Sequence, residues 1–171
     1  MYDYITPSAW ATIYSQPEDH QLTGSSLLTT IPTLKKQWRV THQFKPTLIR
    51  SSSQSSLHLT IGGFEENYGD RTPCIAISGA NMYIKSAIDG VANGGTASPI
   101  PLVLDTWMTI DISQELDQGR FMFRILIDGE EHYSVENTQP QDFNGVKVYA
   151  ASPWRPAQQG FIKRLVIQTR D

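Results

Sequence analysis

Apolar and polar residues alternate along much of this chain, and the alternation predicts β-strands. In WRVTHQFKP (38–46), the side chains of Trp38, Val40, His42 and Phe44 fall on one face of such a strand, with polar or charged side chains on the other. We expect Trp38 to lie in the core. His42 lies among apolar neighbours and has no evident catalytic partner, so we interpret it as a core or interface histidine.

The stretch 101–135 predicts three consecutive strands at the centre of an antiparallel sheet. Trp107 opens the first strand, and we expect this ring also to be part of the core. Asp128-Gly129, flanked by alternating apolar residues, predicts a type I′ turn between the second and third strands, because that turn requires positive φ at both central positions.

About ten short strands separated by turn residues predict one all-β domain over residues 1–171, either a sandwich or a barrel. No long helix, internal repeat or linker is evident. Residues 1–24 mix proline, serine and glycine with a few aromatic residues, and we interpret them as an irregular N-terminal arm or a short edge strand.

Charge and hydropathy argue against several classes of protein. The net charge is −3 over 171 residues, whereas a nucleic-acid-binding protein normally carries a basic face. No apolar run approaches the roughly 20 residues of a membrane span. The N-terminal sequence MYDYITPSAW lacks the layout of a signal peptide. We expect a secreted or extracellular module whose leader is absent from this chain, and a cytoplasmic location stays open.

The single cysteine, Cys74, excludes an internal disulfide and a multi-cysteine zinc site. Its apolar, strand-like setting TPCIAIS predicts a buried and inert thiol.

Several motifs occur in an order that resembles the concanavalin A-like lectin/glucanase superfamily, including laminin G-like and invertebrate extracellular lectin-like modules. They are WMTIDI (107–112), FMFRILIDGEEHYSV (121–135), GFIKRLVI (160–167), WRVTHQFKP (38–46), YGDRTP (68–73) and VYAASPW (148–154). The resemblance covers roughly residues 25–169 and implies an antiparallel two-sheet β-sandwich, or jelly roll. The chain lacks the usual C-terminal disulfide of laminin G modules, which favours the broader superfamily.

Retaining glucanases of this superfamily place three carboxylates on one strand in a pattern like E-x-D-x-E. The nearest match is ELDQG (115–119), which has Glu115 and Asp117 but glycine at the third position, and we expect it to lie at a turn. Adjacent acidic pairs elsewhere would point to opposite faces of a strand. We therefore predict that the protein is not an enzyme.

Calcium is the cofactor that the sequence leaves open. The loop GFEENYGDRTP supplies Glu65, Glu66, Asn67 and Asp70, and oxygen-rich loops of this kind suit calcium. Glu65 and Asp70 are the candidate metal ligands. Alternatively, the loop is solvated, and Asp70 caps a turn or pairs with Arg71.

Two loops have the composition of a glycan site, which needs an aromatic platform beside hydrogen-bonding groups. The candidate ligand-binding residues are Asn67, Tyr68, Asp70, Arg71, Trp154 and Arg155. Trp154 and Arg155 lie between two prolines, which would hold the tryptophan rigid. Alternatively, Trp154 folds back over the sheet edge and Arg155 pairs with an acid.

These features predict a non-catalytic recognition module that binds a glycan or an extracellular protein surface. One alternative is a structural or oligomerising domain without a sugar site, for which a homo-oligomer is the expected partner. Another is a glycoside hydrolase with an unfamiliar site.

Overall fold

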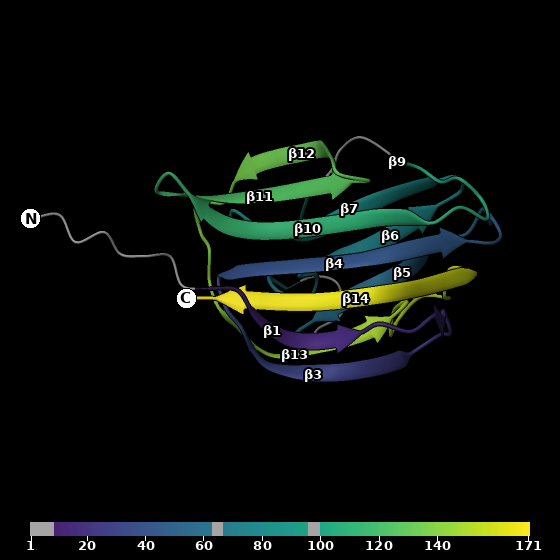
Figure 1. Cartoon of the computed structure of the whole chain (residues 1–171), viewed down its shortest axis with the longest axis horizontal. Helices are drawn as coiled ribbons and strands as arrows, with labels where there is room; N and C mark the ends of the chain where they lie inside the picture. The colour runs from purple at the N-terminus through teal and green to yellow at the C-terminus, as the bar shows by residue number, and fades with distance from the viewer. Residues whose placement is uncertain (1–8, 63–66, 96–99) are drawn as a thin grey trace, which may run out of the picture.

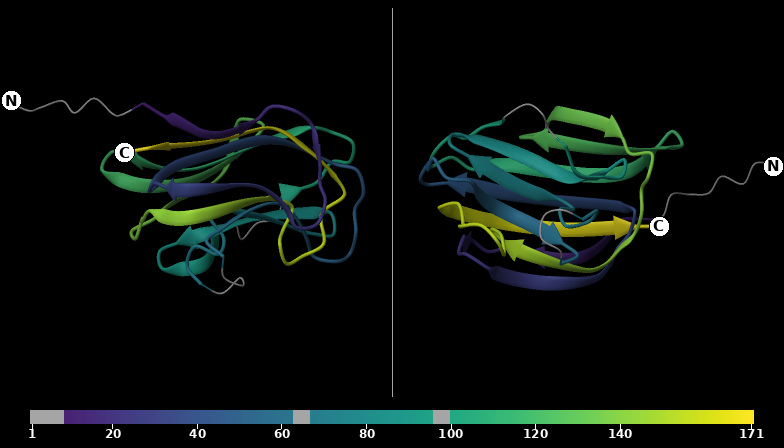
Figure 2. Two further views of the ribbon diagram at one scale, coloured as in Figure 1. Left: turned by 90° about the horizontal axis from the view of Figure 1, so that it is seen from below. Right: turned by 180° about the vertical axis from the view of Figure 1, so that it is seen from behind.

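The protein forms an all-β sandwich of two antiparallel sheets packed face to face, in a computed structural model that describes residues 9–62, 67–95 and 100–171. Figures 1 and 2 show the two layers and the strands running along the long axis of the molecule. The predicted fold class is therefore confirmed. The described residues form strands and loops, and they contain no helix long and apolar enough to cross a membrane.

Among the described residues, sheet A contains seven strands in the spatial order β1-β14-β4-β10-β11-β12, with β2 pairing with part of β14. Their bounds are β1 (Ala11–Gln16), β2 (His20–Gln21), β4 (Gln37–Pro46), β10 (Met108–Asp117), β11 (Arg120–Ile127), β12 (Glu130–Glu136) and β14 (Gly160–Arg170).

Sheet B also contains seven strands in the part of the chain that the structure describes, in the order β3-β13-β5-β6-β7-β8, with β9 pairing with part of β7. Their bounds are β3 (Ser26–Leu34), β5 (Gln54–Thr60), β6 (Cys74–Ser78), β7 (Asn81–Ile88), β8 (Val91–Gly95), β9 (Ile100–Pro101) and β13 (Phe143–Ala150).

The three consecutive strands predicted over 101–135 are β10, β11 and β12, but β12 lies at the edge of sheet A, so the prediction that they form the centre of the sheet is wrong. Asp128 and Gly129 both have positive φ, 51° and 86°, as the type I′ turn requires. A second turn with the same signs, at Gln118 and Gly119, joins β10 to β11. Strand β10 therefore continues through Asp117, and the prediction that Glu115 and Asp117 lie at a turn is wrong.

The core fills the space between the sheets and contains the alternating residues of β4. Trp38 and Phe44 are fully buried, and the Trp38 ring meets Phe123 edge to face at 6.1 Å. His42 is also fully buried, which confirms its interpretation as a core histidine.

The expectation that the Trp107 ring lies in the core is wrong. Trp107 is half-buried on the surface just before β10, with the Lys163 and Lys45 ammonium groups 3.9 and 5.0 Å from its ring centroid. Cation–π contact with two lysines replaces the expected packing in the core. Of residues 1–24, the structure describes 9–24, where strands β1 and β2 lie at the edge of sheet A because both pair with β14. An edge strand is one of the two interpretations that the sequence left open for this segment.

Candidate functional site

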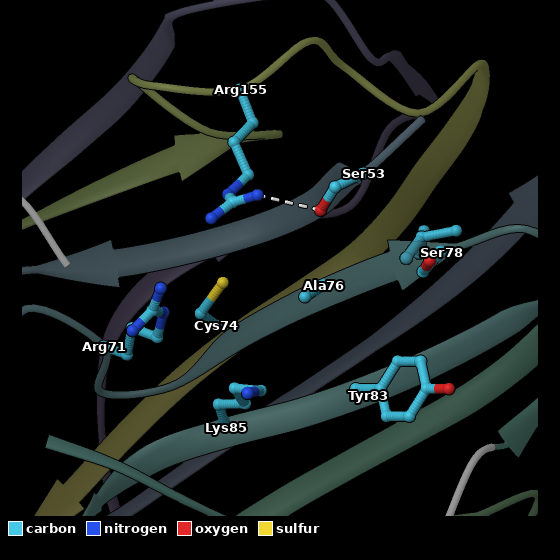
Figure 3. Close-up of a pocket in the computed structure, with 9 residues that line it drawn as sticks. Ser53, Arg71, Cys74, Ala76, Ser78, Tyr83, Lys85 and Arg155 are labelled. Carbon is cyan, nitrogen blue, oxygen red and sulfur yellow. Dashed lines mark hydrogen bonds between the residues drawn. The ribbon is translucent and has the colours of Figure 1, made fainter. Parts of the chain in front are cut away.

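The outer face of sheet B carries a pocket of about 260 Å³ across strands β6 and β7. We call it the β6–β7 pocket. It is lined by Ser53, Arg71, Cys74, Ala76, Ile77, Ser78, Tyr83, Lys85 and Arg155. Figure 3 shows Cys74 and Ala76 on β6, between Arg155 and Ser53 on one side and Lys85 and Tyr83 on the other.

Strand alternation explains why a hollow forms there. Ile75 and Ile77 of β6 are buried, so the small side chains of Cys74 and Ala76 point to the opposite, outer face. Their cross-strand partners on β7 have longer side chains: Cys74 pairs with Lys85, and Ala76 pairs with Tyr83. Short side chains beside long ones leave a depression along β6.

The loop between β13 and β14 forms the opposite wall. It stays beside β5 through hydrogen bonds from Ala151 N to Ser56 O and from Gln158 N to Ser55 O, both 3.0 Å long. At the rim, Arg155 Nη1 donates a hydrogen bond of 2.9 Å to Ser53 Oγ. The loop thus places Arg155 over the sheet from a distant part of the sequence (Figure 3).

His58 connects the pocket to both neighbouring loops. It is buried on β5 and lies directly opposite Cys74 in the β5–β6 register. Its Nε2 lies 2.7 Å from the carbonyl oxygen of Asp70, and its ring meets Trp154 edge to face at 4.7 Å. A single histidine therefore contacts the loop that precedes β6 and the loop that follows β13.

His58 and Cys74 also perturb each other's protonation. Burial raises the pKa of the Cys74 thiol, but its interactions with His58 and Ser55 outweigh burial, and the net pKa lies below its usual value. Burial lowers the pKa of His58, yet the interaction with Cys74 and the Asp70 carbonyl raises it overall. The pair therefore favours a thiolate beside an imidazolium more than isolated groups would.

The structure divides the six predicted ligand-binding residues between two places. Arg71 and Arg155 line the β6–β7 pocket, and Trp154 packs beside it against His58. This packing corresponds to the alternative in which Trp154 folds back over the sheet.

Asn67, Tyr68 and Asp70 do not line the pocket. The Tyr68 ring packs on Phe143 at 5.9 Å, and its hydroxyl donates to the carbonyl oxygen of Gln139. Asp70 is buried, and its carboxylate accepts the backbone N–H of Asn67 at 2.8 Å. These contacts give the three residues structural roles in the loop.

The calcium prediction stays untested, because Glu65 and Glu66 lie outside the described residues. Across 9–62, 67–95 and 100–171, no cluster of three or more histidine, cysteine, aspartate or glutamate side chains could hold a metal ion. Asp70 is the one candidate ligand of the two whose surroundings are described.

Glu115 and Asp117 share the outer face of sheet A, but arginines accompany both of them. Asp117 forms an ion pair with Arg124, and Arg170 lies 3.8 Å from Glu115. Paired in this way, the two carboxylates belong to a surface ion-pair network.

A larger hollow of about 540 Å³ lies near the C-terminus, where cationic and acidic side chains lie together. Lys35 Nζ lies 3.7 Å from carboxylate oxygens of Asp142 and of Asp171. Since its charges compensate one another at the surface, this hollow makes a weaker candidate than the β6–β7 pocket.

The sequence did not predict Ser53, Cys74, Tyr83 and Lys85 as site residues. Alternation in CIAIS and NMYIKSAI does predict which side chains share a face. It does not predict which strands are neighbours or that β6 lies opposite β7 in the observed register. Cys74 is buried, as expected, but it also lies on the pocket floor.

No family model and no curated protein matches the sequence. Solved structures do share the fold. The SAP-like pentraxin from Limulus polyphemus, described as heptameric, aligns with a TM-score of 0.58 at 12% identity over 87% of this chain and 74% of its own.

The binding domain of botulinum neurotoxin serotype D aligns with a TM-score of 0.61 at 13% identity, over 95% of this chain but 43% of its own. The carbohydrate-binding module CBM40 of the Ruminococcus gnavus IT-sialidase, solved with α2,3-sialyllactose, aligns with a TM-score of 0.58 at 15% identity, over 91% and 92%. At these identities the likeness concerns the fold alone, a two-sheet β-sandwich.

Proposed function

We propose that this protein is a non-catalytic recognition module that binds carbohydrate in the β6–β7 pocket. The observation that carries the proposal is the composition of this pocket. One aromatic ring, Tyr83, stands beside a floor of small side chains, and hydroxyl and cationic donors surround it. Sugars combine apolar C–H faces with many hydroxyl groups, and such a mixture of surfaces suits them.

The volume also fits a small ligand. About 260 Å³ lies just below the roughly 300–1,000 Å³ of drug-sized ligand sites, so the pocket has room for one sugar-sized group. The rest of a longer glycan would extend over the surface of sheet B.

The structural neighbours support a binding role through their fold. They include the module solved with sialyllactose and a toxin binding domain. Fold alone does not determine function, so the proposal rests on the residues of the pocket, and the shared fold is consistent with it. Because glycans are exposed outside cells, the proposal includes an extracellular location for this protein.

The test is a glycan array followed by calorimetric titration of the best ligand, using Tyr83→Ala and the matched control Tyr149→Ala. Tyr149 is half-buried on β13 of the same sheet and does not line the pocket. We expect Tyr83→Ala to weaken binding about tenfold or more, and Tyr149→Ala to leave it unchanged. Equal effects of both substitutions, or no glycan binding at all, would contradict the proposal.

Contact with a protein surface is a second candidate function. Leu48, Val103 and Leu104 are exposed apolar residues on the β4–β5 and β9–β10 loops, which the hydrogen bond from Asp105 N to Pro46 O joins. Scattered exposed apolar residues are common, but three on adjoining loops together form an apolar area that a protein partner could cover. Sedimentation across a concentration series tests whether this area joins copies of the chain, with Val103→Ser as the disrupting variant.

A further inference from the structure

Cys74 brings a nucleophilic atom to the floor of the β6–β7 pocket. Figure 3 shows its sulfur pointing away from β6 towards Arg155. The residue is 4% exposed, so a reagent would approach the sulfur through this pocket. The volume of about 260 Å³ is ample for hydrogen peroxide, because one water molecule takes up roughly 30 Å³ and a peroxide contains two such oxygens.

His58 is held next to this thiol by the pairing of β5 with β6. The two residues lie directly opposite each other in the register, so their side chains point to the same face of the sheet. Their Cβ atoms are therefore about 4.5–5.5 Å apart, the separation of such a pair. On its other side, the imidazole contacts the Trp154 ring at 4.7 Å. Backbone pairing and the β13–β14 loop thus hold the ring beside the sulfur.

The position of the hydrogen on His58 follows from its contact with Asp70. Nε2 lies 2.7 Å from the carbonyl oxygen of Asp70. A carbonyl oxygen accepts hydrogen bonds and cannot donate one, so Nε2 carries the hydrogen and Nδ1 holds the lone pair of the neutral ring. Nδ1 is buried and has no hydrogen-bond partner among the described residues. A buried acceptor without a donor costs free energy, and a proton from Cys74 would remove that cost.

We propose that Cys74 is a modification site at which hydrogen peroxide oxidises the thiol to a sulfenic acid, with His58 Nδ1 as the proton acceptor. The S–H proton passes to Nδ1, and the thiolate attacks one oxygen of the peroxide. The S–O bond forms as the O–O bond breaks, and the departing hydroxide takes the proton from Nδ1 to become water. Sulfur loses two electrons and the peroxide gains them. The lowered pKa of the Cys74 thiol favours the first step.

The surroundings of Cys74 also favour a reversible product. The chain has one cysteine, so the sulfenic acid meets no second thiol of the same chain with which to form a disulfide. Its O–H group can donate to the unpartnered Nδ1 of His58. A small thiol such as glutathione condenses with the sulfenic acid to a mixed disulfide and water, and a second thiol releases the cysteine. Oxidation of Cys74 does not depend on which ligand the pocket binds.

The test treats the full chain with hydrogen peroxide at neutral pH in the presence of dimedone, which forms a stable adduct with sulfenic acids. Tandem mass spectrometry assigns the adduct to Cys74 and separates it from oxidation of the four methionines. We expect an adduct on the folded protein and none on Cys74→Ser. His58→Gln should slow its formation at least about tenfold. The matched control His132→Gln should leave the rate unchanged, because His132 is exposed on β12.

A second measurement separates proton acceptance by His58 from a purely structural role. Because the chain has one cysteine, the ultraviolet thiolate absorbance that is lost in Cys74→Ser reports on the protonation of Cys74 alone. This absorbance should be present in the wild type at neutral pH and reduced in His58→Gln. The measurement on the wild type stays informative if His58→Gln fails to fold.

Absence of the adduct from the folded wild type, or its appearance only after unfolding, would overturn the inference. So would an adduct that forms equally fast in His58→Gln, or a wild type without thiolate absorbance at neutral pH. Each of these results leaves the proposed binding of carbohydrate standing, because the glycan titration uses the reduced protein.

Discussion

His42 offers a sharp test of how the core of this protein responds to pH. It is fully buried on β4, opposite Ile110 of β10, and neither ring nitrogen has a hydrogen-bond partner among the described residues. Burial lowers the pKa of His42 from 6.5 to about 3. The imidazole is therefore neutral in the folded protein throughout the mildly acidic range.

The sign of the pH effect follows from the direction of this shift. Between pH 6.5 and about 3, the unfolded chain binds a proton at His42 and the folded chain does not, so stability falls as pH is lowered. With the lowered pKa of His42, the free energy of unfolding falls by about 2 kcal/mol between pH 7 and pH 5. Leaving buried polar atoms without partners costs a further 1–3 kcal/mol or so at any pH.

The perturbation is His42→Leu, which keeps a side chain of similar volume among apolar neighbours. We expect an increase in the free energy of unfolding of about 1–2 kcal/mol at pH 7, after a repacking cost below about 1.5 kcal/mol. At pH 5 the increase should be about 2 kcal/mol larger than at pH 7. For a chain of this size, each kcal/mol corresponds to roughly 2–4 °C in Tm.

The assay is chemical denaturation at pH 7, 6 and 5, with His132→Leu as the control because His132 is exposed on β12. The control should keep the pH dependence of the wild type. If His42→Leu lost stability at pH 7, or kept the full pH dependence, the reasoning from burial without hydrogen-bond partners would be refuted.

Three further predictions concern the loops around the pocket. Trp154→Ala should lower the free energy of unfolding by about 1–2 kcal/mol and weaken glycan binding, because the contact with His58 holds the loop that carries Arg155. Thermal melting measures the first effect and calorimetric titration the second. Unchanged glycan binding would contradict this role of Trp154. His58→Gln should return the pKa of Cys74 towards its usual value and slow the alkylation of Cys74 by iodoacetamide at pH 7. Mass spectrometry measures the alkylation rate across pH. An unchanged dependence of this rate on pH would argue against the interaction of His58 with Cys74. Saturating calcium should leave Tm unchanged, because the Asp70 carboxylate already accepts the N–H of Asn67, whereas a rise that Asp70→Asn abolishes would support a calcium site.

The predictable features of the fold depend on local sequence. Asp128-Gly129 determines its hairpin through the φ values that the turn requires, and alternation from Trp38 to Phe44 identifies the buried face of β4. Trp107 shows where this reasoning fails. Its place next to a strand suggested burial, but the ring lies against Lys45 and Lys163 from two other strands, contacts that no local pattern contains.

Local sequence is enough to predict the all-β class, the Asp128-Gly129 hairpin and the burial of Trp38, because each follows from backbone preferences and period-two patterns over a few residues. The pocket was decided only by the tertiary structure. Its floor requires Cys74 to lie opposite Lys85, and its far wall requires the loop that carries Arg155 to fold over β5, more than 90 positions away along the chain. Strand register and loop docking are consequences of packing the whole core, so charges that are scattered along the sequence meet only when the sandwich is complete.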